Sequence, residues 1–100
     1  MRGCVGLGQG YDLSVPELAR FYGIVIRMYW ADHPPAHMHV FHGDAQALLR
    51  IDTLEIMGGT LSRRALMLVV EWAMAHRAEL AENWARAERG EPILPIAPLE

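Results

Sequence analysis

Three histidines lie close together in the sequence DHPPAHMH, which covers residues 32–39: His33, His37 and His39. If residues 37–42 form a strand, the side chains of His37 and His39 project from the same face, about 6.5 to 7 Å apart at their Cα atoms. His33 lies in the preceding turn and could approach this pair. Imidazole binds transition metals and changes charge near neutral pH. The pattern predicts a site for a metal ion or a phosphate and does not choose between them.

The metal hypothesis assigns all three histidines as ligands. Three imidazoles around zinc or another transition metal would leave a coordination position open for water or a substrate. One of three aspartates could accept a hydrogen bond from a ligand histidine and so fix its orientation: Asp32, Asp44 or Asp52. The alternative is structural, with His33 capping the turn and the other two imidazoles making hydrogen bonds between strands.

The phosphate hypothesis uses the outward face of the same sheet. Arginine and histidine side chains can bind a phosphate and move protons, as an RNA-cleaving enzyme requires. The catalytic candidates are Arg27, Tyr29, His37, His39 and Arg50. A formal net charge of −3 does not favour nucleic-acid binding, although a local basic patch is compatible with it. A solvated sheet face is the alternative.

The histidines follow a segment that is typical of a strand. Residues 21–30 are rich in β-branched, aromatic and long apolar side chains and have no helical repeat. Alternation assigns one set of residues to the core face: Ile24, Ile26, Met28 and Trp30. Pro34 and Pro35 then predict a stiff turn into the strand at residues 37–42.

Two further strands and two helical segments are expected after the histidines. Residues 45–52 alternate, with Ala47, Leu49 and Ile51 inward, and residues 53–57 form a short strand before a break at Gly58 and Gly59. Because the connections are short, we expect an antiparallel meander.

Residues 63–75 form a helix, capped by Ser62, and a charged helical segment continues to residue 89. Its predicted apolar stripe is Leu66, Val69, Val70, Ala73, Leu80 and Trp84. The tail, residues 91–100, is an extended arm over an edge or apolar patch. The fold class predicted is α+β, a three- to four-stranded antiparallel sheet with a long or broken C-terminal helix pair packed on one face.

The helix is apolar over so much of its surface that we expect a homodimer or a protein partner to cover it. Arg63 and Arg64 at its start oppose the helix dipole, which is compatible with an anion or partner site.

Composition indicates one small domain in residues 15–100, since 52% of the residues are hydrophobic and 21% are charged. A single cysteine, Cys4, favours a reducing compartment, and we expect a cytoplasmic protein without a membrane span. Residues 1–14 are glycine-rich and are expected to be mobile, and Val15 is an alternative initiator.

The sequences RFYGIVIRMYWADHPPAHMHVFHG, IDTLEIMGGTLSRRALMLVVEWAMAHRAELAENW and GEPILPIAPLE resemble the small bacterial domain-of-unknown-function family 4160 over residues 15–100. The family motif D-H-x-P-P-H-F-H corresponds here to Asp32, His33, Pro34, Pro35, His37 and His39. Ala36 and Met38 depart from the proline and phenylalanine usual in the family, which affects the rigidity of the turn more than its chemistry. The resemblance implies a two-gene arrangement similar to toxin–antitoxin pairs. We therefore expect a binding or regulatory module of such a system, and the alternative is an enzyme built on the histidines.

Overall fold

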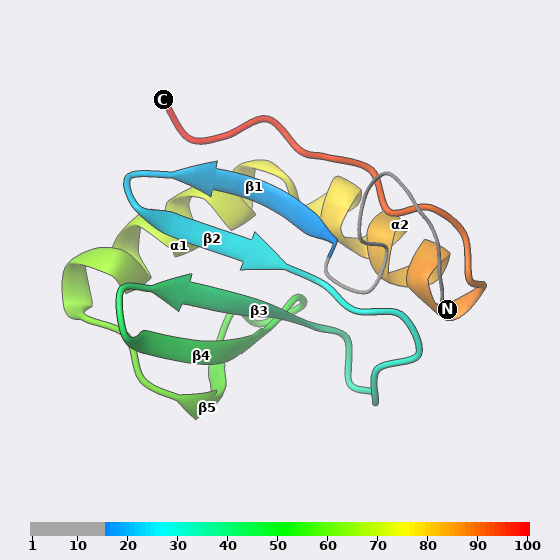
Figure 1. The fold of residues 1–100 in the computed structure, drawn as a ribbon, viewed down its shortest axis with the longest axis horizontal. Helices are drawn as coiled ribbons and strands as arrows, with labels where there is room; N and C mark the ends of the chain where they lie inside the picture. Colours follow the sequence, from blue (N-terminus) through cyan, green and yellow to red (C-terminus); the bar gives the residue numbers. More distant parts are fainter. Residues whose placement is uncertain (1–15) are drawn as a thin grey trace.

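The computed structural model describes residues 16–100, which form a five-stranded antiparallel sheet with two helices on one of its faces (Figure 1). The strands are β1 (Glu17–Phe21), β2 (Ile24–Arg27), β3 (His37–His42), β4 (Ala45–Arg50) and β5 (Ile56–Gly59), and the helices are α1 (Arg63–Ala75) and α2 (Arg77–Glu88). The α+β class and the C-terminal helix pair are confirmed. The prediction of mobility for residues 1–14 lies outside the described residues.

The strands follow one another in the order β1-β2-β3-β4-β5, so the predicted antiparallel meander is confirmed. The number of strands was wrong, because the sheet has five rather than three or four. The predicted strand at residues 21–30 begins within a hairpin: Tyr22 (φ 51) and Gly23 (φ 78) turn the chain between β1 and β2. Each of these residues has a left-handed backbone conformation, which suits a tight turn.

The predicted break at Gly58 and Gly59 was also wrong, because both residues belong to β5. Gly59 pairs with Ala47 of β4 and has φ +76. A Cβ atom at this position would lie 2.2 Å from the carbonyl oxygen of Gln46. Glycine is therefore needed here because two backbones approach each other closely. From the sequence alone, a glycine of this kind cannot be told apart from one that ends a strand.

The core lies between the sheet and the helices. As alternation predicted, the inward residues of the central strands and Met28, which follows β2, are fully buried; those in the strands are Ile24, Ile26, Met38, Val40 and Leu49. Trp72 of α1 and Leu80 of α2 are also fully buried and join the same cluster. Trp30 is only partly buried, because it lies beyond the end of β2 in the loop that leads to the histidines.

The helices begin and end where the sequence indicates. The Ser62 hydroxyl accepts a hydrogen bond from the Ala65 N–H, and Gly90 has φ +73 just after α2. Leu66 and Val70 of the predicted stripe are only half-buried. None of the helices in residues 16–100 has the length and apolarity that crossing a bilayer requires.

The C-terminal arm runs beside β1 at the edge of the sheet (Figure 1). The Ile96 N–H donates to the Leu18 carbonyl at 2.8 Å, and the Trp72 indole N–H donates to the Ala97 carbonyl at 2.8 Å. Asn83 of α2 binds both backbone polar groups of Leu94. The arm therefore covers the sheet edge, as predicted, and is tied to both helices.

We predict that Gly59→Ala destabilises the protein by about 2 kcal/mol or more, because the new Cβ would meet the Gln46 carbonyl and the residue would keep a positive φ. Urea unfolding measures this loss. Gly58→Ala is the matched control, since its Cβ would meet only the end of the Leu48 side chain at 4.0 Å. Equal stability of the two variants would contradict the close approach of β5 to β4.

Candidate functional site

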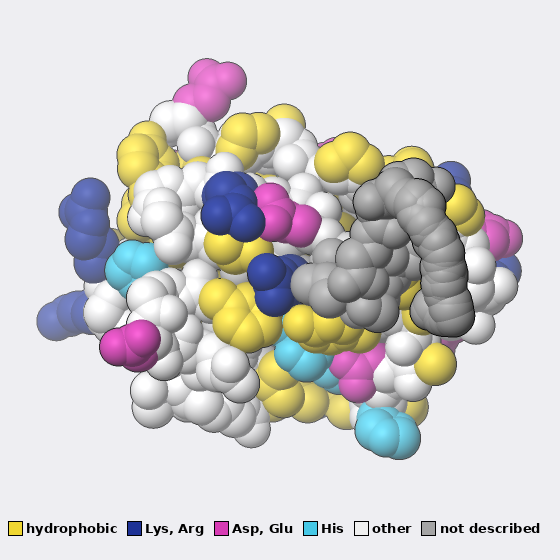
Figure 2. Space-filling model, viewed as in Figure 1, with side chains coloured by type: hydrophobic (Ala, Val, Ile, Leu, Met, Phe, Trp, Pro, Cys, Tyr) yellow, Lys and Arg dark blue, Asp and Glu magenta, His cyan; other side chains and the backbone are white. Residues whose placement is uncertain are grey.

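A carboxylate and two imidazoles converge where β2 leads through a loop into β3. The Nε2 atoms of His37 and His39 lie 3.1 and 2.8 Å from the same oxygen, Oδ2 of Asp32. One ligand atom from each of these side chains lies within 4.8 Å of the others. Figure 2 shows histidine and acidic side chains adjoining one another at this end of the sheet. We call these three residues the Asp–His cluster.

His37 is the most enclosed member of the cluster. It is 4% exposed, and its ring packs against the ring of Trp84 in α2 with centroids 5.3 Å apart. Its Nδ1 atom lies 2.8 Å from the Pro35 carbonyl oxygen. A carbonyl oxygen only accepts hydrogen bonds, so Nδ1 carries the hydrogen and Nε2 faces Asp32.

His39 lies at the more open side of the cluster. Its side chain is 21% exposed, and the edge contact with Tyr29 places the two ring centroids 4.5 Å apart. The His37 and His39 rings lie 5.2 Å apart. Tyr29 and His37 therefore support the His39 ring from two directions and leave part of it accessible.

Asp32 is an anion at neutral pH. Burial by itself would raise the pKa of its carboxyl group, but hydrogen bonds from His39 and from the His33 N–H, with the nearby charges of His37 and His39, hold the pKa below its ordinary value of 3.8. The His33 N–H donates to Oδ1 at 2.9 Å, which leaves Oδ2 for the two imidazoles. The carboxylate thus has a fixed orientation and a negative charge.

The loop that carries Asp32 is held at several points. Ala31 has a left-handed conformation (φ 58) just before Asp32, which a residue with a Cβ rarely adopts. The Trp30 indole N–H donates to the Glu91 carbonyl at 2.8 Å, and the Ile51 N–H donates to the Ala36 carbonyl at 3.0 Å. These contacts fix the start and the end of the loop, so Asp32 reaches β3 from a supported position.

The structure brings together two of the three predicted ligands, His37 and His39. The third, His33, is exposed and lies outside the cluster, whereas Asp32, which was expected to orient a ligand, lies within it. The other two aspartates named above are exposed and lie outside the cluster.

The predicted position of the imidazole pair was half right. His37 and His39 lie side by side and point away from the core residues Met38 and Val40, as expected. His37 is not on an open surface, however, because Trp84 of α2 packs against it. Nothing in the spacing of residues 32–39 indicated a contact with a tryptophan so distant in the sequence.

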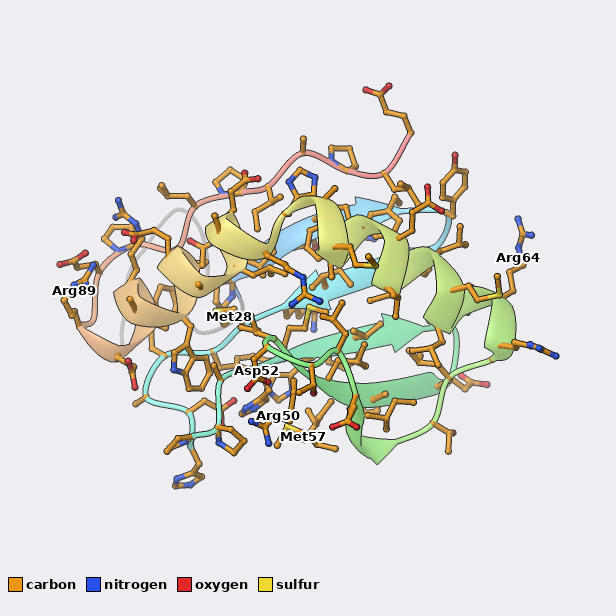
Figure 3. The ribbon with its side chains drawn as sticks, turned by 180° about the vertical axis from the view of Figure 1, so that it is seen from behind. Met28, Arg50, Asp52, Met57, Arg64 and Arg89 are labelled. Carbon is orange, nitrogen blue, oxygen red and sulfur yellow. The ribbon has the colours of Figure 1, made fainter. Side chains whose placement is uncertain are left out.

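The candidates for phosphate chemistry are only partly brought together. Arg27 pairs with His39 in the β2–β3 register, and its guanidinium lies over the Phe41 ring, 4.9 Å from the centroid. Arg50 makes a double hydrogen bond with Asp52, at 2.9 and 2.8 Å, and Figure 3 shows the two side chains beside each other. Tyr29 and His39 are in contact, but the charge of Arg50 is already balanced by Asp52.

Comparison with known families gives a match to the model described as a domain of unknown function (DUF4160), over residues 23–85. This range includes β2, the loop, the whole Asp–His cluster and most of the two helices. No match is found among curated proteins or among solved structures.

We predict that His37→Ala destabilises the protein by about 2 to 4 kcal/mol, since the change removes a buried ring from Trp84 and leaves the Pro35 carbonyl without its donor. Thermal unfolding in the presence of a chelator isolates this structural effect. His33→Ala is the control and is expected within about 0.5 kcal/mol of the wild type, because the side chain is exposed. A larger loss for His33→Ala than for His37→Ala would mean that the wrong histidine has been placed in the cluster.

Proposed function

Because the chain belongs to the DUF4160 family, and because its resemblance to that family implies gene pairs of toxin–antitoxin type, we propose that it is a cytoplasmic binding and regulatory module. In this proposal it acts through a protein partner encoded by the neighbouring gene. The observation that carries the proposal is an exposed apolar surface on α1, the helix predicted to need cover on a second side.

Two methionines define this surface. Met67 and Met74 are 65% and 60% exposed, and they lie two helical turns apart on one side of α1. Within residues 16–100, nothing buries either of them. Isolated exposed apolar residues are ordinary, but flexible methionine side chains repeated along one helix face are suited to contact with a partner.

The positive charge at the start of α1 indicates which charge a partner segment would carry. Arg63 and Arg64 lie in the first turn, where α1 has no acidic residue to balance the positive end of the helix dipole. Both line a shallow hollow of about 450 Å³ together with Met67, Leu68 and Glu71. Figure 3 shows Arg64 extending away from the body of the protein. An amphipathic partner segment with a carboxylate near the arginines complements this surface.

We predict that the double variant Met67→Glu, Met74→Glu loses co-purification with the neighbouring gene product. The loss of an anchor residue from an interface costs more than about 1 kcal/mol, and a glutamate placed there adds a desolvation cost, so the two changes together should weaken the Kd by at least about 30-fold. Pull-down followed by calorimetry of the purified pair measures the change.

Met57→Glu is the matched control, because Met57 is 41% exposed but lies in β5 rather than in α1. It is expected to bind as the wild type does. Undiminished binding by the double variant would exclude the α1 surface, and a wild-type protein that forms only a homodimer in light scattering would replace the neighbour with a second copy of this chain.

A second candidate, RNA cleavage, is favoured by one observation only. Arg27, Tyr29 and His39 lie on the same outer face of the sheet, with Tyr29 against His39. If this candidate is correct, expression arrests growth, and either Arg27→Ala or His39→Ala relieves the arrest because each removes a group needed to bind phosphate or transfer a proton. Harmless expression of the wild-type chain counts against it.

A further inference from the structure

Three ligand atoms converge in the Asp–His cluster. The Nε2 atoms of His37 and His39 lie 3.1 and 2.8 Å from the same Oδ2 atom of Asp32. The Nδ1 atom of His37 faces the Pro35 carbonyl, so Nε2 is the ring nitrogen that is placed to bind an ion. One ligand atom from each of the three side chains lies within 4.8 Å of the others.

We infer that Asp32, His37 and His39 bind one divalent transition-metal ion, of which zinc is the best fit. Two imidazole nitrogens and one carboxylate oxygen form a ligand set that such ions accept, with further positions left for water or a substrate. The inference does not depend on the proposed partner surface of α1, because the metal site and that surface are formed by different elements and would bind different molecules.

The spacing of the three ligand atoms suits an ion of this size. Ligands at about 2.0 to 2.1 Å from zinc, with angles between about 90° and 110°, lie about 2.9 to 3.4 Å from one another. The two imidazole nitrogens lie 3.1 and 2.8 Å from the carboxylate oxygen, and all three ligand atoms lie within 4.8 Å of one another. Two of the three separations therefore already match those around a bound ion.

The surroundings prepare the ligands for a metal. The Pro35 carbonyl fixes the tautomer of His37 that leaves Nε2 free, which is the usual role of an outer hydrogen-bond partner in a metal site. Trp84 and Tyr29 fix the planes of the two imidazoles. The His33 N–H engages the other oxygen of Asp32 and so directs Oδ2 toward the imidazoles.

A hollow of about 290 Å³ borders the cluster at His39, and its wall also includes Phe41 and Leu48. Asp32 and His39 side chains are each 21% exposed, whereas that of His37 is 5% exposed. An ion held here would be covered on the His37 side and accessible on the His39 side, which is the arrangement of a reactive rather than a purely structural site.

The test is zinc titration of the purified, chelator-treated full chain by calorimetry, with metal content measured after dialysis. We expect one zinc per chain for the wild type and a higher Tm with zinc than with chelator. We expect Asp32→Asn and His39→Ala each to weaken zinc binding by about 100-fold or more, because each removes a direct ligand. His33→Ala and His42→Ala are the matched controls and should bind zinc as the wild type does.

Three results would overturn the inference. The first is a wild-type chain that binds no zinc. The second is unchanged zinc affinity in both Asp32→Asn and His39→Ala, each of which must first show a wild-type circular dichroism spectrum. The third is a nitrogen NMR spectrum in which Nε2 of His37 keeps a hydrogen in the presence of excess zinc, since a nitrogen that carries a hydrogen has no lone pair with which to bind the ion.

Discussion

The two-residue alternation of β3 is the constraint on which the site depends. Met38 and Val40 are fully buried beneath the helices, so a shift of this strand by one residue would place both outside the core. With those residues fixed, His37 and His39 must project from the opposite side. The core therefore determines the separation and direction of the two imidazoles, and the free energy of burying the apolar residues holds them in place.

The loop between β2 and β3 supplies what the strand cannot. A strand places two imidazoles in parallel, but a third ligand has to come from a different direction. The left-handed Ala31 and the bond from Trp30 to Glu91 orient the loop so that Asp32 returns over the start of β3. Because Glu91 follows α2, the loop position depends on the helix layer as well as on the sheet.

Periodicity in the sequence was sufficient for the meander, the inward residues and the helices, since each rests on a local repeat and on caps such as Ser62. It was not sufficient for β1, because residues 17–21 do not alternate and their register with β2 shifts between Glu17 and Ala19. Gly59 was missed for a different reason, since its need for glycine comes from Gln46 on another strand. In the candidate site, spacing predicted that His37 and His39 lie together, but not that Asp32 rather than His33 lies beside them. The position of Asp32 follows from the path of the whole loop, which includes the left-handed Ala31.

The burial of His37 is informative about what the cluster does. A buried residue contributes most to stability when it is apolar, and replacing buried charged or polar networks by well-packed apolar residues is often neutral or favourable. His37 instead carries two polar contacts, one to the Pro35 carbonyl and one to the Asp32 carboxylate. The first contact and the packing against Trp84 support the fold, and the second directs a ring nitrogen toward the proposed metal ion. The partly open side of the cluster, at Asp32 and His39, is the part of the described structure where an ion bound there would meet another molecule.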